Sequence, residues 1–116
     1  MTTDAKKFVS DIAANFEALR PEFEASLRDN SGEIIPHLIM AEYCRALISS
    51  DPHSTWVREF LSTLEETLSD SEDDEVSNTI VVSFVEHLPQ PSEHHGVVPL
   101  LGRKLRKQYE TIFGHA

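Results

Sequence analysis

Apolar side chains recur every three or four residues along most of the chain, a spacing that is typical of amphipathic helices. The first such stretch covers residues 4–19. Its apolar face continues past Pro21 to Arg28. Because proline lacks an amide hydrogen and clashes with the preceding turn, we expect the helix either to kink or to restart there. The same pattern predicts four further helices, over residues 34–48, 52–69, 76–88 and 99–114.

Start signals precede three of these helices. Asp51 and Pro52 fit the N-cap and first position of the 52–69 helix. Residues 71–74 fit a cap and acidic first turn for the 76–88 helix, and Pro99 fits the start of the last helix. The side chains expected to face inward are Ile35, Leu38, Ile39, Tyr43, Ala46 and Leu47 in the 34–48 helix, and Leu101, Leu105, Tyr109 and Ile112 in the last.

Residues 76–88 allow two interpretations. The stretch 79–85 is rich in β-branched residues, which favours a buried strand. Against this, Val76, Ile80, Phe84 and Leu88 recur every four residues, and no other segment resembles a strand that could pair with it. We therefore expect a largely buried helix.

These elements predict an all-α fold. The arrangement is either a five-helix bundle or two stacked antiparallel helical pairs behind a kinked N-terminal helix. The chain has 116 residues, a length that suits one domain. No linker rich in Pro, Gly or Ser divides it, so we expect a single helical domain over residues 1–116.

The charge is strongly negative and unevenly spread. The chain has 20 Asp and Glu against 10 Lys and Arg, and residues 103–107 contain four of the bases. This balance argues against bare nucleic acid or an anionic membrane as a main partner. A protein partner, such as a basic toxin, fits better. The carboxylates that could steer a basic partner form a run without a base: Glu65, Glu66, Asp70, Glu72, Asp73, Asp74 and Glu75.

The sequence favours neither a metal nor a cofactor. Asp70, Glu72 and Asp74 have the spacing of the first ligands of an EF-hand calcium loop. However, Glu75 occupies the position of the loop's glycine, and Val81 occupies the position of its bidentate glutamate. His87, His94 and His95 have no fourth ligand at a telling spacing. The single cysteine, Cys44, lies within a helix beside an apolar stripe, where a thiol is usually inert. We therefore expect no catalytic residue, metal or cofactor.

One polar cluster is a candidate site. His37 follows the turn that holds Asp29, Asn30 and Glu33, and a nearby carboxylate would fix the imidazole tautomer and favour its charge. The cluster either ties the turn to the helix start or, less readily, serves catalysis. Trp56 lies one residue before the apolar stripe that begins at Val57, and it either packs at the core edge or anchors a partner.

Three segments resemble signatures of a known family. Residues 27–38 are similar to a DNGELLPHLF motif, residues 74–88 to an EVxNxIxVSFxENL motif, and residues 100–105 to an LGPxLR motif. The chain departs from them at Ser31, inserted before the glycine, and at Arg103, where the family often has proline. The family comprises small, acidic, helical bacterial proteins classed as domains of unknown function. The resemblance implies an all-α fold and no activity.

Three classes of function remain open. The first is a non-catalytic protein-binding module, most specifically an immunity-type inhibitor of a basic toxin, by analogy of size and charge. The second is a helical adaptor or scaffold subunit without a toxin partner. The third is an enzyme with a site around His37. A single cysteine and the absence of a signal peptide or membrane span fit the cytoplasm.

Overall fold

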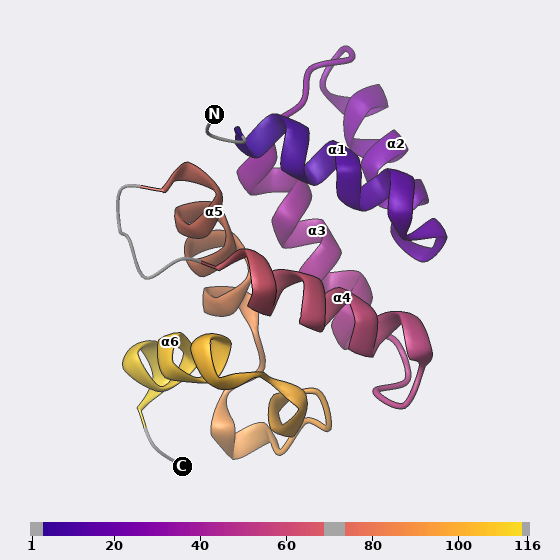
Figure 1. Ribbon diagram of the computed structural model, residues 1–116. Coiled ribbons are helices and arrows are strands. Elements are labelled where there is room, and N and C mark those ends of the chain that lie inside the picture. The colour runs from indigo at the N-terminus through magenta and orange to yellow at the C-terminus, as the bar shows by residue number, and fades with distance from the viewer. Residues whose placement is uncertain (1–3, 69–73, 115–116) are drawn as a thin grey trace.

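A computed structural model describes residues 4–68 and 74–114 (Figure 1), and these residues form helices and no strand. The predicted all-α class is confirmed. The α-helices are α1 (Ala5–Asn15), α2 (Arg20–Asp29), α3 (Pro36–Ile48), α4 (Thr55–Thr67), α5 (Glu75–Ser83) and α6 (Arg103–Phe113). Short 3-10 helices connect some of them: η1 (Glu17–Leu19), η2 (Val85–His87), η3 (Pro91–Glu93) and η4 (Val98–Leu100).

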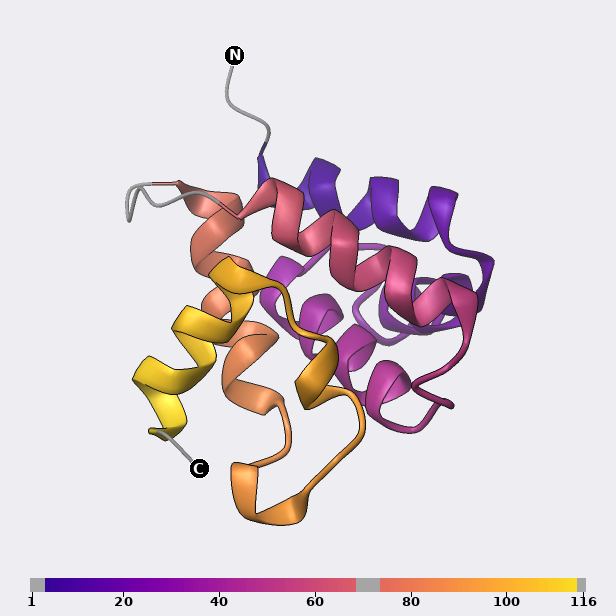
Figure 2. The same ribbon diagram turned by 60° about the horizontal axis from the view of Figure 1, so that its bottom comes forward.

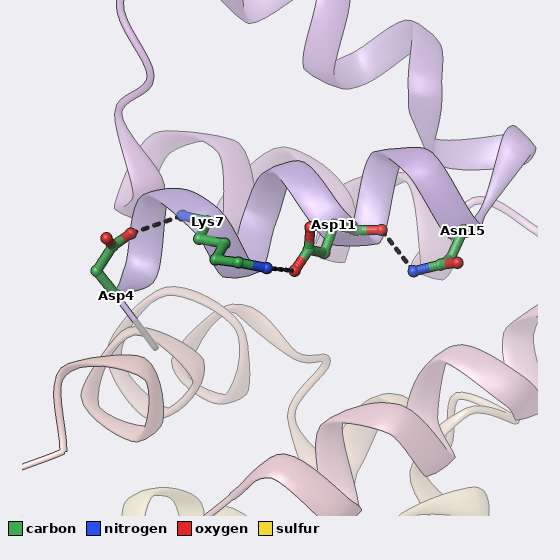
Figure 3. A network of polar contacts seen from close by, with 4 residues as sticks. All are labelled: Asp4, Lys7, Asp11 and Asn15. Atoms are coloured by element: carbon green, nitrogen blue, oxygen red, sulfur yellow. Dashed lines mark hydrogen bonds and ion pairs between the residues drawn. The ribbon is translucent and has the colours of Figure 1, made fainter. Parts of the chain in front are cut away.

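The first helix, α1, is stabilised along its exposed side by polar contacts (Figure 3). Asp4 is its N-cap, and the Asp4 carboxylate accepts the amide hydrogen of Lys7 at 2.7 Å. The Lys7 ammonium pairs with Asp11 one turn further at 2.8 Å, and the Asn15 side chain donates to the carbonyl of Asp11 at 2.9 Å. Both ends of α1 are thereby satisfied locally, as an exposed helix end requires.

Of the kink and the restart expected near Pro21, the structure shows the restart, so the N-terminal segment forms two helices instead of one kinked helix. α1 ends at Asn15, and Phe16 is extended, with φ −123° and ψ 97°. Pro21 lies in the first turn of α2, where its missing amide hydrogen costs no helical bond. The break leaves the Phe16 and Leu19 side chains buried in the core. In one continuous helix, the Phe16 and Leu19 side chains would point in different directions from the helix axis. The burial of both side chains and the position of Pro21 therefore favour two separate helices, α1 and α2.

The turn after α2 uses two residues with positive φ. Ser31 has φ 56° and Gly32 has φ 82°, and the Gly32 amide donates to the Leu27 carbonyl at 2.6 Å. This bond closes the helix in the manner of a Schellman motif, with Ser31 at the left-handed position that usually holds glycine. The inserted Ser31 is therefore accommodated with backbone strain.

Replacing Ser31 by Gly should stabilise the protein by about 0.5–1 kcal/mol. Glycine removes the cost of a left-handed L-residue, and part of that gain is offset by the greater freedom of glycine in the unfolded chain. Urea denaturation followed by circular dichroism measures the change. Ser31→Ala is the control and should give no gain, because alanine retains the Cβ.

Other helix boundaries differ from the sequence predictions. The Asp51 carboxylate accepts the amide of His53 in a turn, and α4 begins only at Thr55, with Ser54 as N-cap. Pro99 lies within η4, and α6 begins at Arg103. In each case proline lies in a short turn ahead of the helix rather than in its first turn. Ile112, expected inside, is 37% exposed.

The 76–88 stretch is helical, as predicted, through α5 and then η2. Its N-cap is Asp74, whose carboxylate accepts the Val76 amide at 3.0 Å. Residues 71–73 of the predicted cap and acidic turn lie outside the described residues. The residues with four-residue spacing are all buried: Val76, Ile80, Phe84 and Leu88.

The buried side chains form one core around Phe60 of α4. The Phe60 ring contacts Phe16, Tyr43 and Phe84 edge-on, with centroids 5.6, 6.2 and 5.7 Å away. These rings come from the end of α1, from α3 and from the end of α5, so one side chain joins four elements. α6 and the segment before it lie at the end of the molecule away from α1 and α2 (Figure 1, Figure 2).

Truncating Phe60 to Ala should lower the free energy of unfolding by about 3–5 kcal/mol, the usual cost of removing a buried aromatic ring. The measurement is chemical denaturation. Ile112→Ala is the matched control on an exposed apolar position and should change stability by less than about 0.5 kcal/mol. A loss at Phe60 no larger than at Ile112 would mean that Phe60 does not organise the core.

Candidate functional site

Glu65, the first residue of the predicted acidic run, is engaged inside the fold. Its carboxylate accepts the backbone amides of Lys104 and Leu105, each at 2.9 Å, at the N-terminus of α6. The Lys104 ammonium donates to the Leu68 carbonyl at 2.8 Å. Glu65 therefore acts as the capping group of a helix about 40 positions away, and we leave it out of the proposed partner surface.

Gly102 makes this contact sterically feasible. It is the N-cap residue of α6 and provides no side-chain cap. A Cβ at Gly102 would lie 2.6 Å from Glu65 Oε1, which is far closer than van der Waals contact. The glycine of the LGPxLR-like segment is thus explained by the approach of a carboxylate.

Glu65→Gln should destabilise the protein by about 1–2 kcal/mol, because two hydrogen bonds to a charged acceptor and its interaction with the helix dipole are weakened. Gly102→Ala should cost a similar amount by displacing the same carboxylate. Since both changes remove one contact, their effects should be far from additive in a double-mutant cycle measured by urea denaturation. The adjacent exposed Glu66→Gln is the control. Additive losses would contradict the proposed contact.

The rest of the run divides between capping and exposed positions. Asp74 caps α5, whereas Glu66 and Glu75 are exposed. The remaining predicted residues, Asp70, Glu72 and Asp73, lie outside the described residues. Their role in steering a partner stays a prediction.

His37 contacts α5 rather than a carboxylate. Its Nδ1 lies 2.6 Å from the Ser83 hydroxyl, and this contact joins the first family-like segment to the second. Within the described ranges, His37 forms no ion pair with Asp29 or Glu33. The His37 side chain is exposed, but Ser83 is only 4% exposed. The contact therefore ties the start of α3 to the end of α5.

Asp29 and Asn30 belong to a different feature, a groove between α2 and α3. The Asn30 side chain donates to the Ser26 carbonyl at 2.8 Å, which fixes the end of α2. Glu33 is exposed in the following turn. The predicted cluster of Asp29, Asn30, Glu33 and His37 is thus not brought together as one site.

The groove has a volume of about 240 Å³, and both carboxylates and apolar side chains line it. Leu38, which was expected inside, is 40% exposed beside it. Glu42 is paired with Arg45 at 2.6 Å, while Glu22 and Asp29 form no ion pair with described residues. The sequence pattern did not identify Glu22 and Glu42 as groove residues. It placed Leu38 inside the fold, because Leu38 falls on the apolar stripe of its helix. The lining residues are Glu22, Ala25, Ser26, Asp29, Asn30, Leu38 and Glu42.

Trp56 packs at the edge of the core. It is partly buried, and its ring centroid lies 6.5 Å from that of Phe60. This position agrees with packing at the core edge, the first of the two roles considered for Trp56. We therefore do not include Trp56 among the residues that could contact a partner.

The side chains of Cys44 and His95 have hydrogen-bond partners inside the fold. Burial raises the pKa of the Cys44 thiol to about 12, and Cys44 Sγ donates to the Phe84 carbonyl. A protonated, buried thiol is a poor nucleophile. His95 Nε2 lies 3.0 Å from the Ile48 carbonyl, and its Nδ1 accepts the Val97 amide. Within residues 4–68 and 74–114, no three His, Cys, Asp or Glu residues could hold a metal ion together.

The described residues form an all-α fold with a groove lined by carboxylates and apolar side chains. Residues 9–115 match the family model described as Domain of unknown function (DUF7674), and the chain belongs to that family. Searches of curated proteins and of solved structures gave no match. Among the described helices, none has the length and apolar character needed to cross a membrane.

Proposed function

We propose that this protein is a non-catalytic protein-binding module whose partner presents a basic surface. The observation that carries the proposal is the groove between α2 and α3, where Glu22, Asp29 and Glu42 surround the exposed Leu38. An arginine or lysine has an aliphatic stem and a cationic head, so it would contact both kinds of groove residue at once.

The charge of the whole chain supports a basic partner. With a formal net charge of −10, the protein attracts cationic surfaces at long range and speeds their encounter. The exposed Glu66 and Glu75 and the carboxylates of residues 70–73 add to this field. In the proposal, the acidic run attracts the basic partner at long range, and the groove makes the short-range contact with it.

The most specific form of the proposal is an immunity-type inhibitor. Nuclease toxins carry positive clefts for phosphate groups, and an acidic domain can occupy such a cleft. We place this interaction in the cytoplasm of a bacterial cell. The single cysteine, a buried thiol, is consistent with a reducing compartment.

The test begins by capturing partners from native cell extract at low salt and eluting them with high salt. We expect a basic protein, whose association rate is then measured at about 0.1 M and 1 M salt, between which the Debye length falls from about 10 Å to about 3 Å. Neutralising the groove should slow association about tenfold at low salt and also speed dissociation. This groove variant carries Glu22→Gln, Asp29→Asn and Glu42→Gln.

Two further variants remove three charges each. Neutralising the acidic run should slow association and have little effect on the dissociation rate. Neutralising scattered exposed acids should leave the dissociation rate unaltered, and of the three variants it should slow association the least. Capture of no basic protein, or equal effects of groove and scattered changes, would refute the groove. A toxin encoded beside the gene supports the inhibitor; a basic partner that is not a toxin supports an adaptor instead. The run variant carries Glu66→Gln, Asp70→Asn and Glu72→Gln, and the scattered variant Glu17→Gln, Glu59→Gln and Glu86→Gln.

A further inference from the structure

The N-terminal half of α6 is strongly basic, although the chain as a whole is acidic. The first turn of α6 contains no acidic residue, whereas the helix dipole favours acids and disfavours cations at that end. Sequences break such local preferences mainly at functional surfaces. Four bases fall within the first five residues of α6: Arg103, Lys104, Arg106 and Lys107.

Two of these bases have no carboxylate partner. Lys104 and Arg106 donate to backbone carbonyl groups, at 2.8 and 3.1 Å. Arg103 and Lys107 are exposed, and no ion pair joins either side chain to the described residues. Because they are four positions apart, both lie on the same face of α6, with Cβ atoms about 5–6 Å from each other. We call this pair the basic face of α6.

The groove between α2 and α3 has the complementary charge. Glu22 and Asp29 line it and form no ion pair with the described residues. They are seven positions apart on α2, or about 10 Å along the helix axis. The long side chains of arginine and lysine can spread to match this spacing. The exposed Leu38 beside the carboxylates can pack against their aliphatic stems.

We propose that the basic face of α6 in one copy of the chain binds the groove of a second copy. α6 and α2 lie at opposite ends of the molecule (Figure 1), so a single copy does not make this contact with itself. Two different surfaces meet, and the contact is therefore head-to-tail. Arg103 and Lys107 of one copy pair with Glu22 and Asp29 of the other.

This inference rests on the proposed function, because it uses the same groove, and it adds a form of regulation. A second copy covers the carboxylates that a basic partner needs, so self-association and partner binding compete. The net charge of −10 on each copy opposes self-association. The contact between copies should therefore be weak and should yield to a partner that carries more bases.

The experiment concentrates the full-length chain without any partner and follows it by sedimentation equilibrium and amide NMR shifts. We expect concentration-dependent shifts in residues 22–42 and 103–107. Raising the salt from about 0.1 M to about 1 M should weaken the association, since the Debye length falls from about 10 Å to about 3 Å. General repulsion between acidic copies predicts the opposite salt dependence, and that result would overturn the proposal.

Neutralising either surface should weaken self-association about three- to tenfold, the range expected for the loss of two exposed ion pairs. The matched control also removes two exposed bases, but away from both surfaces, and should change the association by less than about twofold. An effect of the control as large as that of the α6 variant would overturn the proposal. The α6 variant carries Arg103→Gln and Lys107→Gln, the groove variant Glu22→Gln and Asp29→Asn, and the control Lys6→Gln and Arg58→Gln.

A charge swap tests the contact at unchanged net charge. Each half of the swap alone should remove most of the self-association, whereas the two halves in one chain should restore it. Circular dichroism verifies that each variant remains helical, and a helical swap variant without restored association would overturn the proposal. One half carries Arg103→Glu and Lys107→Glu, and the other carries Glu22→Lys and Asp29→Lys.

The same measurements separate this contact from other uses of the two surfaces. Shifts in α6 that appear with short single-stranded DNA, but not on concentrating the protein, would assign the basic face to nucleic acid and overturn the proposal. A chain that stays monomeric can still bind a basic partner through the groove. A chain that captures no basic partner can still self-associate, so the two proposals fail separately.

Discussion

The carboxylate of Glu65 at the N-terminus of α6 is the contact on which the C-terminal part of the fold depends. The first amides of a helix have no partner within the helix, and Gly102 supplies no side chain to satisfy them. Glu65 satisfies two of them from α4. α6 is thereby placed so that Tyr109 reaches Pro89 and Arg106 reaches Pro99. The packing of α6 against the segment before it is thus supported by a carboxylate that comes from α4.

Much of the secondary structure could be predicted because helical periodicity is a local property. The four-residue spacing of Val76, Ile80 and Phe84 identified α5 despite the β-branched composition of that stretch. The boundaries at Pro52 and Pro99 were wrong, since a proline fits a short turn before a helix as well as the helix's own first turn. Periodicity also placed Leu38 inside, because a sequence does not show where a neighbouring helix stops covering a stripe.

The candidate site was harder to predict, since it depends on contacts between distant segments. Glu65 looked like one more solvated carboxylate, and only the approach of α6 shows that it is a cap. His37 lies near Asp29 and Glu33 in sequence, yet its partner is Ser83, 46 positions away. The groove likewise combines Glu22 of α2 with Glu42 of α3. No spacing rule within one segment indicates such pairs.

The contact between Glu65 and α6 has an evolutionary consequence. A side chain at position 102 would displace the Glu65 carboxylate from the amides of α6, so we expect the two positions to change together within the family. Relatives that keep glycine at 102 should keep the acid at 65, and relatives that replace the glycine by a residue able to cap α6 itself should be free to lose that acid. Positions 65 and 102 should therefore co-vary, even though 37 positions separate them along the chain.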